Sequence, residues 1–230
     1  MFHPKGPSFM EQARQALSST KKGYDLLAPK FEFTPYLTPS WMLDAVAPLV
    51  GEVESGLDVC CGTGAGLRML APSVSKRLVG IDFSQGMLNE VEVDPGEATL
   101  ELVQGDVRKM EFSEEFDVAT CFGALGHFVD DEEDLLISQV FKVLKPGGRF
   151  LFVTGFRPER WTSAYWFTHS FNTAMRVRNA LIKPQFVMYF HTFILPGIRQ
   201  KLEKAGFEVA VRNPQNWRNW RVVCATRPSD

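Results

Sequence analysis

Short apolar segments alternate along the chain with longer segments in which apolar residues recur every three or four positions. The short segments predict buried strands, and the longer segments predict amphipathic helices. One strand is expected from Leu57, and others at residues 77–82, 99–104, 116–121, 149–154, 207–212 and 220–226; the expected helices cover residues 41–49, 65–70, 131–143 and 195–205. This alternation indicates an α/β fold, a Rossmann-like, doubly wound and mostly parallel sheet with helices on both faces.

The end of the chain departs from a purely parallel sheet. The last helix is expected to stop at Gly206, and the two strands after it are separated by a short connection that contains the turn-like segment 213–216. Strands joined so closely must be antiparallel, which predicts a C-terminal β-hairpin. The sheet of a dinucleotide-binding fold is usually all parallel, so the hairpin disfavours that fold.

The first expected strand runs into a glycine-rich turn at 62–66 that opens directly into a helix. Gly62 and Gly64 can adopt backbone angles that other residues avoid, and without a Cβ they let a ligand lie against the main chain. The free N–H groups at the start of the helix favour a carboxylate or a phosphate. The turn therefore predicts a nucleotide-like cofactor. The dinucleotide pattern G-x-G-x-x-G does not fit, because Leu67 stands at its third glycine position.

An acidic residue, Asp82, ends the second expected strand. Ligands of open parallel sheets bind beyond the carboxyl ends of the strands, where an acid can accept hydrogen bonds from both ribose hydroxyls. Ser84 is expected to cap the helix that follows. Phe83 and Met87 are candidates to flank an adenine ring, or alternatively belong to the ordinary core.

The acid Asp58 followed by the three spaced glycines of the turn resembles the first motif of class I S-adenosylmethionine-dependent methyltransferases. Cys60 stands where that family usually has its first glycine; because cysteine is small and tolerates burial, we expect a slightly tighter loop that keeps the site. The segment Leu-Lys-Pro-Gly-Gly at 144–148, followed by an apolar strand, is also similar to this family. We expect it to form a turn that ends a helix.

The resemblance implies roles for further residues. Asp106 would accept a hydrogen bond from the adenine amino group, and the backbone N–H of Val107 would donate to the ring. Backbone carbonyls at Cys121 and Phe122 would receive the ammonium group of the methionine portion. A helix carrying Tyr24 would fold over the cofactor, although Tyr24 is equally a candidate for a half-buried surface residue. The expected cofactor-binding residues are Tyr24, Asp58, Cys60, Gly62, Gly64, Asp82, Phe83, Met87, Asp106, Val107, Cys121 and Phe122.

Two segments lie outside the common plan of that family. We expect residues 1–38 to form an N-terminal lid segment and residues 39–230 to form the methyltransferase domain, with a cap insertion at about 155–191. The cap is rich in large apolar side chains, namely Trp161, Tyr165, Trp166, Phe167, Phe171, Met175, Phe186, Met188, Tyr189 and Phe190. Most of them are expected to hold the cap on the sheet, and others to offer flat apolar faces to an acceptor. A membrane-surface or dimer contact is the alternative.

Composition limits the classes of function. A chain of 230 residues is long enough for one α/β domain, and its formal net charge of −2 argues against nucleic-acid binding by bulk electrostatics. The four cysteines have neither disulfide-framework nor zinc spacing, so we expect reduced thiols and no metal. The acidic run at 130–134 is explained as the start of a helix. The absence of a long apolar run or an apolar signal core predicts a cytoplasmic protein without a membrane span, while its oligomeric state stays open.

Together these features predict methyl transfer from S-adenosylmethionine to a small, hydrophobic or aromatic acceptor by in-line displacement. Such a reaction needs mainly alignment and exclusion of water. His127, just after the fourth expected strand, is the candidate general base for an acceptor that carries a proton, with a structural role as the alternative. His169 and His191 are weaker candidates.

Other functions stay open. Ten arginines follow position 148, and the segment 217–221 interleaves tryptophan with arginine, which suits an RNA or other nucleic-acid methyltransferase. Against this, the fourth strand ends in Cys-Phe-Gly-Ala instead of the Asn/Asp-Pro-Pro-aromatic motif of base-amino methyltransferases. A catalytically silent S-adenosylmethionine-binding protein is also possible. A nicotinamide-dependent oxidoreductase is disfavoured by the turn and the hairpin.

Overall fold

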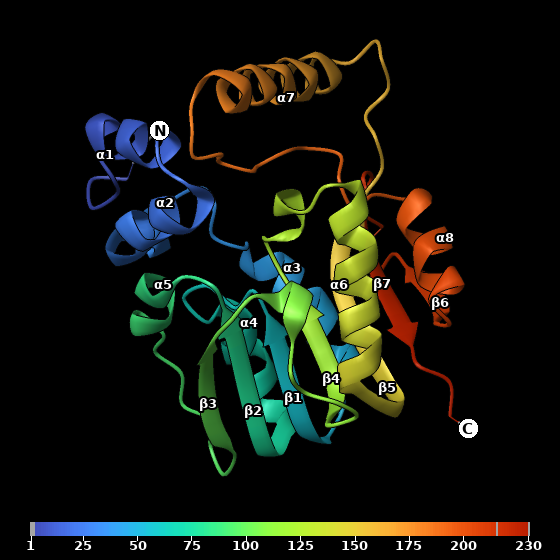
Figure 1. Ribbon diagram of the computed structural model, residues 1–230. Coiled ribbons are helices and arrows are strands. Elements are labelled where there is room, and N and C mark those ends of the chain that lie inside the picture. Colours follow the sequence, from blue (N-terminus) through green and yellow to red (C-terminus); the bar gives the residue numbers. More distant parts are fainter. Residues whose placement is uncertain (1–2, 215, 230) are drawn as a thin grey trace.

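Seven strands form one sheet at the centre of the computed structural model, which describes residues 3–214 and 216–229 (Figure 1). Their order is β3-β2-β1-β4-β5-β7-β6. The strands are β1 (Val53–Val59), β2 (Val74–Asp82), β3 (Thr99–Gln104), β4 (Phe116–Cys121), β5 (Leu144–Gly155), β6 (Glu208–Arg212) and β7 (Trp220–Thr226). The first five strands pair in parallel, and β7 runs antiparallel to both β5 and β6. The predicted Rossmann-like sheet with an antiparallel C-terminal hairpin is confirmed; Gln215, in the predicted turn at 213–216, lies outside the described residues.

Helices cover both faces of the sheet (Figure 1). They include α3 (Ser40–Val46), α4 (Ala65–Leu70), α5 (Gln85–Asn89), α6 (Asp130–Val143) and α8 (Gly197–Lys204). One apolar core joins α6 and α8 to the sheet through residues such as Leu136, Val140 and Leu202. A second core joins α3 and α4 to the sheet through Val46 and Leu67. Each fully buried side chain of this size contributes about 1.5–3 kcal/mol, so these two cores fix the sheet between its helices.

The strand order reverses between β1 and β4, because β1 pairs with β2 on one side and with β4 on the other. Parallel strands that diverge in this way leave a crevice beyond their carboxyl ends. The glycine-rich turn follows β1, Asp82 ends β2, and Phe122 follows β4. Residues predicted for the site therefore converge at this edge of the sheet.

The segment 144–148 differs from its prediction. Helix α6 ends at Val143, but the next residues belong to β5, where Leu144 pairs with Phe116 before the register shifts. The N–H of Gly147, at a φ of 79°, donates to the carbonyl of Arg227 just beyond β7. The predicted end of the helix is confirmed, but the predicted turn was wrong, because Phe116 of β4 and Arg227 just beyond β7 supply backbone partners for an irregular strand.

Two further parts of the chain lie over the carboxyl edge of the sheet (Figure 1). The N-terminal part holds α1 (Phe9–Ala16), α2 (Thr20–Leu27) and a 3₁₀ helix at Ala28–Phe33. The other part follows β5 and holds α7 (Ser163–Leu181), which the sequence did not predict as a helix. Arg178 joins the two by donating to the carbonyls of Ala16 and Ser18 at 2.9 and 2.8 Å.

Across the described ranges, no helix has both the length and the apolar character needed to cross a bilayer.

Candidate active site

A cavity of about 1270 Å³ lies between the carboxyl edge of the sheet, the N-terminal helices and the segment around α7. It is larger than the space that one small ligand usually fills, so it has room for two. The predicted site residues that line it are Tyr24, Asp58, Cys60, Gly62, Asp82, Phe83, Met87, Asp106, Val107, Phe122 and His127. Gly64 and Cys121 do not line it.

The three glycines of the turn serve different purposes. Gly62 has a φ of 54°, and a Cβ at this position would meet nothing within 4 Å, so its backbone borders open space. Gly64, at a φ of 90°, packs outside the cavity, where a Cβ would lie 3.1 Å from Val91. At Gly66 a Cβ would lie 2.3 Å from a carboxylate oxygen of Asp58, which explains why only glycine fits there.

Cys60 takes the left-handed backbone conformation, with a φ of 58°. The family's usual glycine would adopt this conformation without strain, whereas a residue with a Cβ pays about 1–2 kcal/mol. The turn therefore forms with cysteine in place of glycine, and the backbone at Cys60 is strained. A hydrogen bond with Cys121, together with burial, raises the pKa of the Cys60 thiol. Cys121 itself is buried in the core beneath the cavity.

Asp58 is buried against the glycine-rich turn. Its carboxylate accepts a hydrogen bond from the hydroxyl of Thr120 at 2.8 Å, and its side chain is 2% exposed. Burial raises the pKa of Asp58 to about 7, because the low-dielectric surroundings disfavour the charged form.

Asp82 links the turn to the next helix. One carboxylate oxygen accepts from the N–H of Gly62 and the other from the N–H of Ser84, both at 2.9 Å. Burial raises the pKa of this carboxyl as well. The hydroxyl of Ser84 accepts from the N–H of Met87 at 3.2 Å, so the predicted helix cap is confirmed.

The carboxylate of Asp106 has a partner that the sequence reasoning did not consider. Arg108 donates to both of its oxygens, and this pairing holds the pKa of Asp106 below its usual range. Arg108 also pairs with Glu132 at the start of α6. A ligand that donates a hydrogen bond to the Asp106 carboxylate therefore shares this acceptor with Arg108.

Tyr24 and His127 form a hydrogen-bonded pair in the cavity wall. The Tyr24 hydroxyl lies 2.7 Å from Nε2 of His127, and Nδ1 of His127 lies 2.5 Å from the carbonyl of Val187. A carbonyl can only accept, so Nδ1 carries the proton and Nε2 accepts from the tyrosine. Burial lowers the pKa of His127 and raises that of Tyr24, which keeps both groups neutral. Sequence reasoning missed Val187, because a backbone carbonyl far along the chain leaves no residue signal.

Asp25, the residue after Tyr24, is another contributor that sequence reasoning missed. Its carboxylate accepts from the hydroxyl of Ser84 at 2.6 Å and from the N–H of Gly86 at 3.0 Å. It thereby fixes α2 against α5 at the cofactor turn. The signal was the Tyr-Asp pair itself, of which only the tyrosine was considered.

The large apolar residues of the segment 155–191 divide into those that line the cavity and those that are exposed. Met188, Tyr189 and Phe190 line the cavity. Most of these residues were expected to hold the segment on the sheet, but Trp161 is 80% exposed, so the expectation is wrong for Trp161. Its backbone leaves the sheet just before α7, and no packed layer lies over it.

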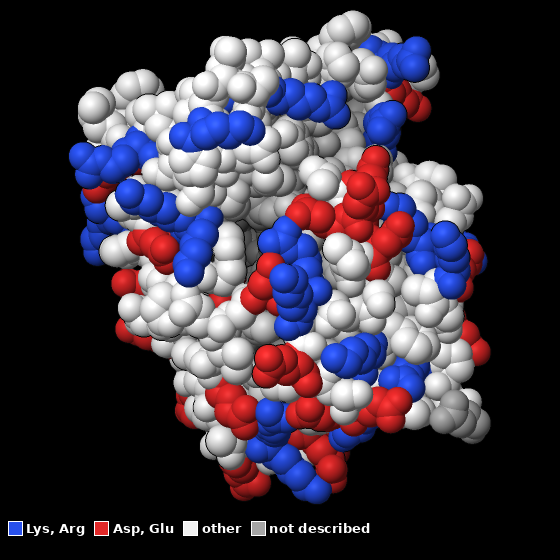
Figure 2. Space-filling view, viewed as in Figure 1, with Lys and Arg blue, Asp and Glu red and all other residues white. Residues whose placement is uncertain are grey.

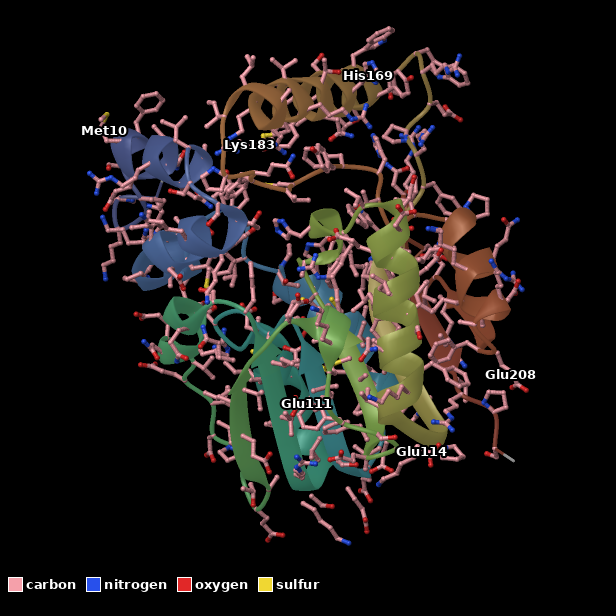
Figure 3. All side chains as sticks on the ribbon, viewed as in Figure 1. Met10, Glu111, Glu114, His169, Lys183 and Glu208 are labelled. Carbon is pink, nitrogen blue, oxygen red and sulfur yellow. The ribbon has the colours of Figure 1, made fainter. Side chains whose placement is uncertain are left out.

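Of the two other histidines considered, only His191 lines the cavity, where its ring bonds to the hydroxyl of Thr168 at 2.6 Å. His169 is exposed on α7, at the top of the molecule in Figure 3. Among residues 3–214 and 216–229, no group of three or more histidine, cysteine or acidic side chains is arranged to hold a metal ion.

The sequence matches a family described as "Methyltransferase domain" over residues 57–148, which span β1 to the beginning of β5. Residues 57–148 therefore match a methyltransferase domain, and the sheet around them has the class I methyltransferase fold. It is 29% identical over 157 residues to a demethylmenaquinone methyltransferase of Lactococcus lactis, an alignment that covers 64% of this chain and 60% of that protein. The demethylmenaquinone methyltransferase of Staphylococcus aureus strain JH9 is 28% identical over 219 residues, or 88% of each chain.

The methyltransferase domain also has solved structural neighbours. Magnesium protoporphyrin IX methyltransferase from Synechocystis PCC 6803, with bound SAH, superposes with a TM-score of 0.55 at 20% identity, over 80% of this chain and 81% of that one. The cofactor of the domain is S-adenosylmethionine. The cavity fits such a group in two respects: Gly62 leaves open space where a Cβ would project, and the buried acid Asp82 lies beside it.

Proposed function

We propose that the protein transfers a methyl group from S-adenosylmethionine to a small, hydrophobic or aromatic acceptor that carries an ionisable hydroxyl. The observation that supports this most directly is the neutral Tyr24–His127 pair, which lines the same cavity as the glycine-rich turn. We further propose that residues 1–38 act as a lid segment and that 155–191 form a cap insertion in a domain spanning 39–230. The four free cysteines are consistent with a reducing, cytoplasmic setting.

The cofactor half of the cavity is assigned to the turn and the strand ends. In this proposal Asp82 accepts hydrogen bonds from the ribose hydroxyls, and Gly62 lets the cofactor approach the main chain. Phe83 and Met87 flank the adenine ring, while Asp106 and Val107 bond to its edge. The backbone at Cys60, Cys121 and Phe122 and the N-terminal Tyr24 complete the set, and Gly64 shapes the turn from outside.

The chemistry assigned to the protein is proton removal and alignment. When bound, S-adenosylmethionine supplies a methyl group on a positively charged sulfur, which leaves as a neutral thioether. Nε2 of His127 has a lone pair that already accepts from Tyr24. We propose that the acceptor hydroxyl gives its proton to the Tyr24 oxygen while Tyr24 passes its own proton to His127. The proton thereby ends on His127 and the acceptor becomes the nucleophile.

The acceptor half is assigned to the segment around α7. Phe156, Tyr189 and Phe190 contribute aromatic surface to the cavity, and a flat apolar acceptor buries well against such rings. The curated relatives named above act, by their names, on demethylmenaquinone, and the structural neighbour on magnesium protoporphyrin IX, both ring compounds. A hydroxylated polycyclic arene is the acceptor class that we propose.

The test is calorimetric titration of the purified protein with S-adenosylmethionine, followed by an acceptor screen that measures release of S-adenosylhomocysteine. Asp82→Asn should weaken cofactor binding at least about ten-fold, because a hydrogen bond to a charged group contributes about 1.5–3 kcal/mol. The matched control is Asp44→Asn, an exposed acid on α3 that does not line the cavity. The affinity of this variant for S-adenosylmethionine should equal that of the wild type.

Turnover with hydroxylated naphthalenes but not with short hydrophilic alcohols or an RNA oligonucleotide supports the proposal. Turnover with RNA alone would overturn the acceptor class. Cofactor binding without turnover of any acceptor would identify a silent binding protein instead.

A further inference from the structure

Helix α7 carries large apolar side chains on the side that faces solvent as well as on the side that faces the protein. On the inner side, Thr168, Asn172 and Asn179 bond to His191 and to the backbone of Phe190 and Phe186. On the outer side, Trp166, Phe167, Val177 and Leu181 are 59%, 65%, 52% and 79% exposed. A helix that only covers a cavity needs large apolar side chains on its buried side alone.

Helix α1 continues this surface. Phe9, Met10 and Leu17 are 79%, 73% and 56% exposed, and Arg178 ties the end of α1 to α7. Met10 and His169, labelled in Figure 3, both lie at the end of the molecule that is away from the sheet. We name this surface the outer face and define it by its exposed apolar residues, Phe9, Met10, Leu17, Trp161, Trp166, Phe167, Val177 and Leu181.

The charge around the outer face is mostly positive, with Glu11, which pairs with Lys30, and Glu159 as acids at its edge. No acidic residue occurs from position 160 to position 202, whereas Arg160, Arg176 and Lys183 are exposed within that range. Arg14 and Lys21 add exposed cations on the N-terminal side. The surface over α7 is accordingly white and blue in Figure 2.

We infer that the outer face docks the protein on the surface of an anionic phospholipid bilayer. Exposed tryptophan and aliphatic side chains enter the boundary between headgroups and acyl chains, and the surrounding cations are attracted to anionic headgroups. A second copy of this chain fits less well, because a two-fold contact would bring the same excess of cations together. Nucleic acid fits less well too, because single strands bind aromatic side chains within a positive groove, not along the outside of a helix.

The position of the outer face agrees with this role. Ala164 and Thr168 of α7 line the cavity, while Trp166 and Phe167 project on the outer side. A bilayer at the outer face would lie one helix diameter from the acceptor half of the cavity, about 10 Å away. Docking itself does not depend on the proposed function; only the delivery of a lipophilic acceptor from the bilayer rests on it.

The experiment measures co-flotation of the full chain with vesicles. Vesicles of phosphatidylcholine alone are compared with vesicles that also contain phosphatidylglycerol, at low and at raised salt. We expect binding to the anionic vesicles that weakens as salt screens the cations. Leu181→Ser combined with Trp166→Ser should lower the partition coefficient about ten-fold or more, because both side chains leave the acyl boundary.

The matched control is Leu135→Ser, because Leu135 is 50% exposed on α6, away from the outer face. This variant should partition like the wild type. S-adenosylmethionine affinity, measured by calorimetry on every variant, should stay unchanged, which shows that the domain is folded. If the wild type does not bind S-adenosylmethionine, that result contradicts the proposed function but leaves the docking result unaffected.

Three outcomes would overturn the inference. The first is an absence of binding to anionic vesicles, and the second is equal partitioning of the Leu181 and Leu135 variants. The third is that the Trp166 and Leu181 substitutions leave vesicle binding unchanged but abolish another interaction. That interaction would be a concentration-dependent dimer, seen by analytical ultracentrifugation, or the binding of an RNA oligonucleotide.

Discussion

Cys60 shows how one residue can keep a turn that is better suited to glycine. Its φ of 58° is accessible to a residue with a Cβ only at a cost, and its thiol is held against Cys121 in return. Cys60→Gly should therefore change the free energy of unfolding by no more than about 1 kcal/mol, because relief of strain offsets the lost thiol packing and the added flexibility of the unfolded chain. Cys60→Val should lose about 2 kcal/mol or more, because a β-branched side chain is strongly disfavoured at this φ. Chemical denaturation measures both changes.

Cys224→Val is the control for this prediction, because Cys224 lies in β7, where a β-branched residue suits the strand. It should be close to neutral. A valine at position 60 that is tolerated as well as one at 224 would show that the turn relaxes away from the left-handed conformation.

His127 carries the second prediction at the level of single residues. Burial lowers its pKa below 6.5, so it is a neutral, proton-accepting base at pH 7 and loses this capacity as the pH falls through the lowered value. The rate of methyl transfer to a hydroxylated acceptor should be flat near pH 7 and should fall on acidification. His127→Gln should reduce kcat about 10²–10⁴-fold and remove that acidic limb, while cofactor affinity stays the same.

His169→Gln is the matched control, because His169 is exposed and outside the cavity lining. It should keep the wild-type rate and pH profile. An unchanged pH profile in the His127 variant would assign this histidine a structural role.

At the level of elements, Glu133 joins α6 to two other parts of the chain. Its side chain, buried in the core, accepts from the N–H of Phe193 at 2.6 Å and from Lys201 of α8 at 2.8 Å. The acidic run at 130–134 was explained by the helix dipole alone, but Glu133 is a buried connection. Glu133→Gln should lower the free energy of unfolding by about 1.5–3 kcal/mol, because hydrogen bonds to a charged group contribute this much.

Thermal or denaturant unfolding tests this prediction, with Asp131→Asn as the control. Asp131 lies in the same turn but is exposed, so its replacement should cost only the helix-dipole contribution of about 0.3–1 kcal/mol. Equal losses in the two variants would mean that the dipole explanation is sufficient.

For the whole molecule, the cavity walls come from the sheet edge, the N-terminal helices and the segment around α7. A ligand that contacts all three stabilises them together. S-adenosylmethionine at 100 times its Kd should raise the free energy of unfolding by about 2.7 kcal/mol. Hydrogen exchange should slow at α2 and near Val187 as well as at the turn. Protection confined to the turn would mean that the cofactor binds without engaging the N-terminal part.

The sequence by itself determined the sheet, its hairpin and the cofactor turn, because these follow from local patterns. Strands β3, β4 and β7 begin and end at the predicted residues, and so does helix α4. The positions of Gly62 and Gly64 also follow from left-handed backbone geometry that only glycine adopts freely. The acids at the ends of β1 and β2 lie together because parallel strands place their carboxyl ends on one edge.

Only the tertiary structure decided the contacts between distant segments. Tyr24 and His127 are separated by 103 residues, and His127 and Val187 by 60, so no local pattern indicates that they meet. The strand identity of residues 144–148 depended on backbone partners from β4 and from Arg227, just beyond β7. The exposed apolar side of α7 could not be predicted either. The sequence shows that aromatic residues are present, but not which side of their helix the rest of the protein covers.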